Sequence, residues 1–237
     1  MNLLAVIPAL IPETTDICIE TALMDKSSLG FLKEDILIVD NSRDGFAFKY
    51  DLRTHRDPDG HNLGVARAWN VGAREVMEKK LDYLVIVSAS MQFGVEFHTT
   101  FHKQMMTFWG SNIIEATGHS WHLIALHRNL FEEIGLFDEN FYPAYFEQVD
   151  WCYRLKMVGK ESGWPHAWLN ALSQGSALHL PAVSCPADPL LQYYREKWGG
   201  DKGEEKFKLP YGDKPMDYFE DRSIPELAEK YQLEKWW

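Results

Sequence analysis

DILIVDNSRDG, residues 35–45, decides the fold, because a short apolar run passes directly into a polar turn there. An apolar run bounded by turn residues is typical of a strand that is covered on both faces of a parallel sheet. Leu3 to Ile7 and Tyr83 to Val87 are two more runs of this kind. Within residues 14–23 and 62–80, apolar residues recur at the spacing of a helix. The alternation of strands and helices predicts a right-handed parallel α/β sheet, with a ligand crevice at the carboxyl ends of the strands.

The remaining sequence predicts further helices and one long loop. Apolar spacing favours helices near 96–108 and 129–135, and Thr14 and Thr15 are candidate caps of the first helix. Residues 181–215, rich in Pro, Gly and charge, indicate an ordered loop or flap. Ser223 and Glu226 form a capping-box pattern, which predicts a final helix before Trp236 and Trp237.

Composition limits the classes of protein that this chain can belong to. The 237 residues are 46% apolar and 14% aromatic, enough for one large domain with a substantial core. A net charge of −11 disfavours a large nucleic-acid footprint. Cys18, Cys152 and Cys185 lack the spacing of a disulfide framework or zinc site, which favours a reducing cytoplasm. The first apolar run, interrupted by Pro8, is interpreted as a strand and not a signal peptide, and no run is long enough to span a membrane.

Five motifs, in the same order along the chain, carry a resemblance to a known family. They are VIPAL (Val6 to Leu10), VDNSRDG (Val39 to Gly45), NLGVARAWNVG (Asn62 to Gly72), FEEIGLFDENFYPAYFEQVDWCYRLKMVG (Phe131 to Gly159) and YYREKWGG (Tyr193 to Gly200). Together they resemble the inverting family-two GT-A glycosyltransferases over about four fifths of the chain. The resemblance implies a Rossmann-like GT-A fold with a mixed, mainly parallel sheet flanked by helices. It also implies a nucleotide-binding half over about 1–95, an acceptor half over about 96–180, and a C-terminal flap and helix over 181–237 packed on the same domain.

The resemblance implies a donor site at the carboxyl ends of the strands. Its predicted members are Pro8, Ala9, Asp40, Asn41, Asn62, Gly64, Arg67, Asn70, Ser88 and Ser90. A carboxylate at a strand end, such as Asp40, can accept a hydrogen bond from a nucleobase, although it is also a common turn-forming residue. Asn62 and Gly64 at a helix entry would allow the backbone to approach a phosphate or ribose.

The first departure from the family concerns the metal. Similar enzymes end the third strand in Asp-x-Asp, which holds Mg²⁺ or Mn²⁺ against the donor diphosphate, whereas this chain has Ser88-Ala89-Ser90. Two hydroxyls cannot replace two anionic ligands, so no tightly bound cofactor and at most a weak need for Mg or Mn are expected. Ser90 and His179 are the only candidate metal ligands. His179, Arg195 and Lys197 are predicted to neutralise the diphosphate, unless they are surface charges or a core histidine.

The second departure concerns the general base. The family's usual carboxylate is replaced by an amide in Glu147-Gln148-Val149-Asp150, and an amide cannot accept a proton at neutral pH. Glu147 or Asp150 could serve instead, and His119 is a further candidate because its ordinary pKa is near neutrality. The catalytic candidates are therefore Asp150, Glu147, Gln148 and His119. In the alternative interpretation Asp150 pairs with Arg154, and Glu147 caps the helix.

Acceptor contacts are expected from aromatic and imidazole side chains. Trp121, His122 and Trp198 are the predicted acceptor-binding residues, although Trp121 could equally belong to the core. Asp138 and Glu139 are interpreted as turn residues.

Three functions follow from these patterns. The leading hypothesis is a soluble, cytoplasmic glycosyltransferase that uses a nucleotide-sugar and an acceptor hydroxyl on a glycan, small molecule or modified DNA base. The second is a degenerate domain that binds a nucleotide, sugar or protein partner without catalysis. The third is a viral-type enzyme of the host cytoplasm acting on modified DNA bases, with Arg67, Arg74, Lys79 and Lys80 as its basic face. No integral membrane contact is expected, and homo-oligomers are left open.

Overall fold

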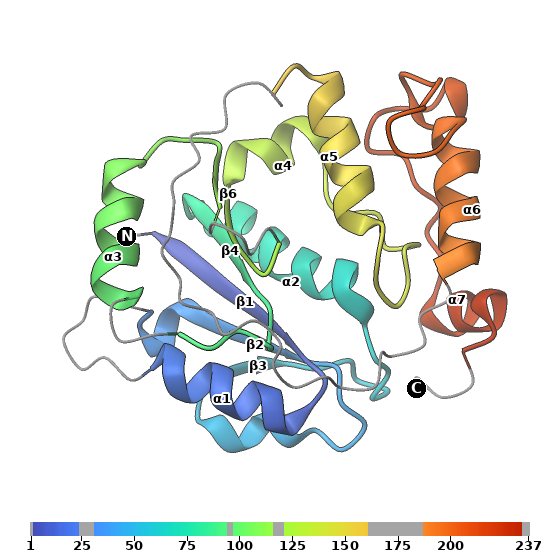
Figure 1. Cartoon of the computed structure of the whole chain (residues 1–237). Coiled ribbons are helices and arrows are strands. Elements are labelled where there is room, and N and C mark those ends of the chain that lie inside the picture. The colour runs from blue at the N-terminus through green and yellow to red at the C-terminus, as the bar shows by residue number, and fades with distance from the viewer. Residues whose placement is uncertain (1, 24–30, 94–96, 116–120, 161–186, 234–237) are drawn as a thin grey trace.

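A six-stranded sheet forms the centre of the computed structural model, which describes residues 2–23, 31–93, 97–115, 121–160 and 187–233 (Figure 1). The strands are β1 (Leu3–Ala9), β2 (Ile36–Asp40), β3 (Arg53–His55), β4 (Tyr83–Val87), β5 (Ile113–Glu115) and β6 (Leu123–His127). Their order across the sheet is β3-β2-β1-β4-β6-β5. β1 pairs in parallel with β2 and β4, β2 pairs in parallel with β3, and β6 runs antiparallel to β4 and β5. The predicted mixed, mainly parallel sheet is confirmed.

Burial explains why the central strands are continuous apolar runs. All five residues of β2 and of β4 are buried, because helices cover both faces of the sheet. The helices are α1 (Pro12–Ala22), α2 (Gly64–Glu78), α3 (Phe97–Thr107), α4 (Arg128–Ile134), α5 (Glu147–Met157), α6 (Ala187–Trp198) and α7 (Ile224–Tyr231). Short 3-10 turns span Lys33–Asp35, Phe46–Tyr50 and Pro210–Gly212.

The two faces of the sheet carry separate hydrophobic cores. On one face, side chains of α1 and α3, such as Cys18 and Phe101, pack on β1, β2 and β4. On the other face, α2, α4 and α5 cover the sheet, and α6 and α7 add a further layer through residues such as Trp198 and Leu227 (Figure 1). The C-terminal elements therefore share one core with the residues that precede them.

The helix ends show where local signals succeed and where they fail. Ser223 and Glu226 form the predicted capping box at the start of α7. The prediction that Thr14 and Thr15 cap α1 is wrong, since the helix begins at Pro12 and both hydroxyls donate to the carbonyl of Ile11. A proline at the first helical position needs no side-chain partner for the missing N–H.

The predicted loop over 181–215 is wrong in part. Residues 187–198 form α6, because Leu190, Tyr194 and Trp198 present an apolar face to the core at helical spacing. Three strands, β3, β5 and β6, also escaped prediction, and β3 and β5 have only three residues each. Trp236 and Trp237 lie outside the described residues.

None of the helices in the described part of the chain is both long and apolar enough to cross a membrane.

Candidate active site

A cavity of about 360 Å³ lies at the carboxyl ends of β1 and β4. These neighbouring strands form a switch point, because the sheet continues from β1 toward β2 on one side and from β4 toward β6 on the other. Ligands of open α/β sheets bind at such points. The lining residues come from five separate segments: Pro8, Val65, Trp69, Ile86, Ser88, Ala89, Trp121, His122, Ala144, Tyr145, Glu147 and Gln148.

Glu147, the first residue of α5, supplies the one carboxylate among these lining residues. The residue is only 4% exposed, and its Oε2 has no hydrogen-bond partner in the described part of the chain. Burial raises the pKa of Glu147 to about 8, and the backbone amides of Glu147 and Tyr145 oppose that rise only in part. A buried carboxyl with an unpaired oxygen and a pKa near neutrality is suited to accept or donate a proton.

Gln148 also lines the cavity, and its Oε1 lacks a partner within the described residues. Two adjacent side chains of α5 therefore carry buried, unpaired oxygens beside the same cavity. Buried polar atoms are normally hydrogen-bonded, so the pair indicates a place for ligand hydroxyls or water.

Ser88 and Ser90, at the end of β4, do not fit a hard divalent cation. Ser88 lines the cavity, and its Oγ lies 2.8 Å from the Oγ of Ser90, so the two hydroxyls are bonded to each other. Mg²⁺ and Mn²⁺ prefer anionic oxygen ligands, and neither serine offers one. The donor set at the end of β4 therefore does not match the metal that the fold family usually holds there.

Aromatic side chains form one wall of the cavity. The Trp121 ring stacks on Trp69 with centroids 5.7 Å apart and meets Trp151 edge-on at 6.0 Å. Tyr145 stands at the rim with 53% of its surface exposed, and His122, also exposed, lies beside Trp121 in the chain. Trp121 and His122 thus occupy the predicted region, whereas Trp198 is fully buried elsewhere.

The Asp40 carboxylate accepts hydrogen bonds within the turn that follows β2. Its Oδ1 accepts from the amide and hydroxyl of Ser42, its Oδ2 accepts from the amide of Ala47, and the residue is fully buried. These bonds are those of the turn-forming alternative, and a nucleobase would have to compete with them. Arg56, which sequence reasoning missed, lies 3.7 Å from Asp40 and donates to the Ser42 carbonyl.

The residues at the entry to α2 that were predicted to bind the sugar donor form hydrogen bonds with the backbone of this region. The Asn41 Oδ1 accepts from the amide of Leu63, and the Asn62 Oδ1 accepts from the amide of Gly64. Gly64 has a φ of +73°, and a Cβ there would lie 2.8 Å from the Pro143 carbonyl oxygen. This glycine is therefore required for the close contact between α2 and the segment before α5. Pro8 lines the cavity, while Ala9 is fully buried beside it.

Arg67 and Asn70 of α2 face Glu139 instead of the cavity. The Arg67 Nε lies 3.2 Å from Glu139, and the Asn70 amide donates to Glu139 and to the Phe137 carbonyl. Arg74 also pairs with Glu139, and Lys79 pairs with Glu75. Three of the four residues of the predicted basic face thus pair with acidic neighbours, and the face carries charges of both signs.

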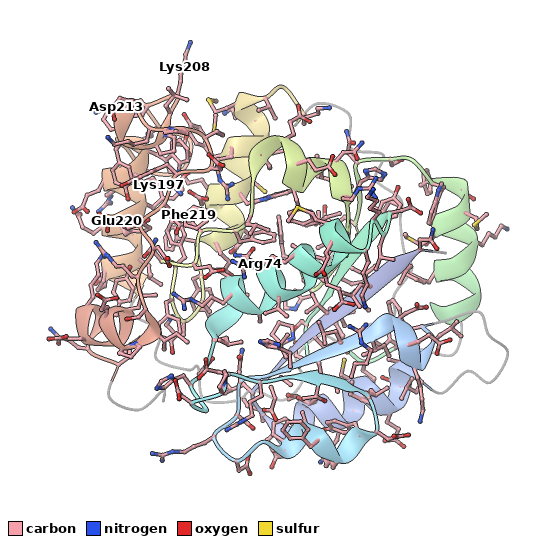
Figure 2. All side chains as sticks on the ribbon, turned by 180° about the vertical axis from the view of Figure 1, so that it is seen from behind. Arg74, Lys197, Lys208, Asp213, Phe219 and Glu220 are labelled. Carbon is pink, nitrogen blue, oxygen red and sulfur yellow. The ribbon has the colours of Figure 1, made fainter. Side chains whose placement is uncertain are left out.

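A buried ion cluster of Asp138, Asp150, Arg154 and Lys197 occupies the core between α5 and α6. Lys197 Nζ lies 2.6 Å from Asp150 and 2.9 Å from Asp138, and the Arg154 Nε lies 3.0 Å from Asp150. All four residues are fully buried. Figure 2 shows Lys197 near Phe219, whose ring centroid is 5.9 Å from Nζ, while Lys208 extends away from the molecule.

This cluster corrects the expected placement of three residues. Although burial acts to raise it, the pKa of Asp150 is held below its ordinary value by the charges of Lys197 and Arg154. The Trp198 indole also donates to Asp150 at 2.9 Å. Asp150 therefore has no free oxygen for a substrate, and Lys197 and Trp198 pack in the core instead of lining the cavity. The pairing of Asp150 with Arg154 follows the alternative interpretation.

Among the remaining predicted residues that the structure describes, Arg195 does not join the site. Arg195 is exposed on α6 and forms an ion pair with Asp201 at 2.6 Å. His119 and His179 lie outside the described residues. Asp138 accepts from the amide of Asn140, as its predicted role in a turn requires.

Sequence reasoning missed the contributions of Trp69 and Tyr145 to the cavity. Trp69 looked like one more core residue on the apolar face of a helix. Tyr145 lies two residues before Glu147, and a large aromatic residue beside a candidate base was the only signal that could have identified it.

A second cavity and a possible metal cluster lie away from this site. The cavity, of about 470 Å³, follows the exposed side of α2 and is lined by residues of both charge signs, including Arg67, Glu75 and Glu139. The oxygens and nitrogen of Asp57, Asp59 and His61 lie within 4.8 Å of one another near the end of β3. Neither borders Glu147.

Comparisons with known proteins show a likeness of structure alone. No model of a known protein family and no curated protein matches the sequence. Among solved structures, the mannosyltransferase PcManGT from Pyrobaculum calidifontis in complex with GDP-Man and Mn²⁺ is 17% identical, with a TM-score of 0.48, and the alignment covers 67% of this chain and 52% of that chain. TarS 1-349 of S. aureus is 13% identical, with a TM-score of 0.47, over 66% and 56% of the two chains. GalNAc-T7 with UDP, GalNAc and Mn²⁺ is 12% identical, with a TM-score of 0.51, over 67% and 41%.

Such low identities speak to the fold and not to the activity. The matched regions make up about half the length of the solved structures. The order of strands and the likeness to GalNAc-T7 together show that this chain has the GT-A fold.

Proposed function

We propose that the protein transfers a sugar from a nucleotide-sugar to an acceptor hydroxyl, with Glu147 as the general base. The observation that carries this proposal is the buried carboxyl of Glu147, which borders a cavity at the switch point of a GT-A sheet. The similar structure of GalNAc-T7 was solved with UDP, GalNAc and Mn²⁺, which agrees with a nucleotide-sugar donor.

The proposed reaction is a single displacement that inverts the anomeric centre. The ionised Glu147 carboxylate takes the proton of the acceptor hydroxyl, and the oxygen attacks the anomeric carbon of the donor. The bond from that carbon to the diphosphate breaks, and the nucleoside diphosphate leaves with the electron pair. The products are a glycoside, a nucleoside diphosphate and the proton held by Glu147, which returns to solvent.

The donor would lie against the ends of β1 and β2, close to Pro8, Asn41 and Asn62. Ser88 and Ser90 are offered as hydrogen-bond partners of the donor sugar, and not as metal ligands. We therefore propose a weak dependence on Mg²⁺ or Mn²⁺. Lys197 is buried in the core and Arg195 pairs with Asp201 on α6, whereas Arg56 lies beside Asp40 at the end of β2. Arg56 is therefore the cation proposed to approach a diphosphate near β2.

The test replaces the base without changing its shape. Glu147→Gln should lower the release of UDP or GDP from a panel of UDP- and GDP-sugars by a factor of about 10²–10⁴. Stabilisation by UDP or GDP in a thermal-shift assay should remain, with or without EDTA. Glu132→Gln, an exposed glutamate of α4, is the matched control and should behave as the wild type. Turnover of the Glu147→Gln variant within twofold of wild type would refute this role.

A second candidate function is a domain that binds a nucleotide-sugar without transferring it. The bonded pair Ser88 and Ser90, in place of two carboxylates, favours this candidate. Thermal stabilisation by UDP or GDP with no product from any nucleotide-sugar would identify a binding domain.

A further inference from the structure

An unusual backbone turn directly before α5 places one aromatic side chain inward and one outward. Tyr145 and Phe146 have φ values of +79° and +70°, a left-handed conformation that bulky residues rarely adopt. The Phe146 ring packs against Phe141 and Tyr194, with centroid distances of 6.3 and 5.8 Å. Phe146 thus anchors the turn, and Tyr145 is left at the rim of the cavity. Strained conformations of this kind concentrate at ligand sites.

Aromatic packing also fixes Trp121. This residue has a φ of +65°, and its ring stacks on Trp69 and meets Trp151 edge-on at 81°. Both Trp121 and Tyr145 line the same cavity. In the described part of the chain, no aromatic ring packs on Tyr145, so its ring is available to a ligand.

The chemistry of the cavity selects against an anionic ligand. None of its described lining residues is lysine or arginine, and its one carboxylate, Glu147, would repel a phosphate once ionised. The polar groups present are a carboxyl, the Gln148 amide, the Ser88 hydroxyl and the His122 imidazole, all suited to neutral hydroxyls. A volume of about 360 Å³ is near the lower end of small-molecule sites, enough for one or two rings.

A pyranose ring has both an apolar face and hydroxyl groups, which are complementary to the aromatic and polar side chains of this cavity. One of its faces carries C–H groups, whose weakly positive hydrogens are attracted to the negative face of an aromatic ring. Its rim carries hydroxyls that can reach polar side chains. An acyclic polyol has the hydroxyls but no flat apolar face, and a nucleotide carries negative charge that the cavity does not neutralise.

We propose that Tyr145 forms a stacking subsite for a neutral pyranose ring of the acceptor in the cavity that Trp121 also lines, and that this ring presents a hydroxyl to Glu147. This inference rests on the proposed function and narrows its acceptor to a sugar or glycoside. Tyr145 is a binding residue that determines acceptor class, and takes no part in proton transfer.

The experiment measures binding to defined probes by saturation-transfer difference NMR. The probes are the methyl pyranosides of glucose, galactose, mannose and N-acetylglucosamine, with sorbitol and glycerol as acyclic controls. For at least one pyranoside, wild-type protein should transfer saturation mainly to the C–H protons of one ring face. Tyr145→Ala should reduce this signal at least fivefold, and Tyr145→Phe should retain it because the ring is kept. Tyr218→Ala removes an exposed tyrosine outside the described lining of the cavity and should leave the signal unchanged.

Two results would overturn the subsite. One is the absence of binding to every pyranoside, or equal binding of the acyclic polyols. The other is an unchanged signal in a Tyr145→Ala variant whose circular dichroism and melting temperature match the wild type. Release of UDP or GDP by the wild-type protein is measured separately. If release occurs but no pyranoside binds, only the subsite fails, whereas if no nucleotide-sugar is consumed, the proposed function fails.

Discussion

At the scale of single residues, the two carboxylates of α5, Glu147 and Asp150, have different environments although both were predicted as catalytic candidates. Glu147 and Asp150 lie three positions apart on one helix, and the sequence offers no reason to separate them. The structure does so because Asp150 meets Lys197 and Arg154 in the core, while the Oε2 of Glu147 has no partner among the described residues. Two carboxylates with different surroundings acquire different protonation behaviour.

The activity is expected to depend on the ionisation of Glu147. Because burial raises the pKa of Glu147 to about 8, the fraction of carboxylate, and so the transfer rate, should increase tenfold per pH unit below that value. The rate should level off above pH 8. Release of nucleoside diphosphate measured from pH 5.5 to 9.5 checks this profile, and a rate that is flat below pH 8 would contradict it.

The same ionisation should affect stability. The ordinary pKa of 4.5 applies in the unfolded chain, so between about pH 4.5 and 8 the native state keeps a proton that the unfolded state has lost. The contribution of neutral Glu147 is therefore fully present below pH 4.5, and it is lost as the pH rises, by about 1.4 kcal/mol per pH unit. The free energy of unfolding of Glu147→Gln relative to wild type should increase between pH 5 and 8.

Urea denaturation at four pH values measures this difference. Glu132→Gln is the control, because Glu132 is exposed and its replacement should give a difference that does not change with pH. An equally constant difference for Glu147→Gln would mean that the carboxyl titrates normally.

Only part of the site could be read from the residues themselves. The turn after β2, the glycine at the entry to α2 and the candidate base were all recognisable from short motifs. The buried positions of Lys197, Trp198 and Asp150 could not be recognised. A side chain within a family motif looks the same in the sequence whether it contacts a ligand or a buried partner.

At the scale of elements, α5 and α6 depend on each other through the buried ion cluster. Lys197 from α6 bridges Asp150 of α5 and Asp138 of the preceding segment, and Tyr193 also donates to Asp138 at 2.7 Å. Pairing across two helices fixes the position of α5, whose first residue is Glu147. This tertiary arrangement also explains why α6 was predicted as a loop: its Pro, Gly and charged surroundings dominated the local signal.

Lys197→Met should lower the free energy of unfolding by about 3–5 kcal/mol, because it leaves Asp138 buried without a compensating charge. Arg195→Met is the matched control and should have little effect, since Arg195 is exposed and its partner Asp201 can be solvated. Adding Asp138→Asn to Lys197→Met should recover part of the loss. Urea denaturation of the three variants measures these differences, and equal stability of the two single variants would contradict the role of the cluster.

At the scale of the whole molecule, the alternation of strands and helices was sufficient to predict the three strands at the centre of the sheet and the edge where the cavity lies. β1, β2 and β4 are continuous apolar runs, and their order along the chain permits few topologies. The sequence could not indicate how far the second layer of helices extends, because α6 and α7 acquire their buried faces only through contacts with α2, α4 and α5.

The C-terminal layer should therefore be necessary for folding. Leu190, Tyr194, Trp198 and Leu227 are fully buried in the core that α2 and α4 also form. Removing residues 187–237 would expose that core and also leave Asp138 and Asp150 without Lys197. The chain ending at residue 186 is expected to show no cooperative thermal transition by near-ultraviolet circular dichroism. A separate peptide of residues 187–237 should restore the transition if the layer acts through packing alone. A truncated chain that melts cooperatively near the wild-type temperature would show instead that residues 1–186 fold as an independent domain.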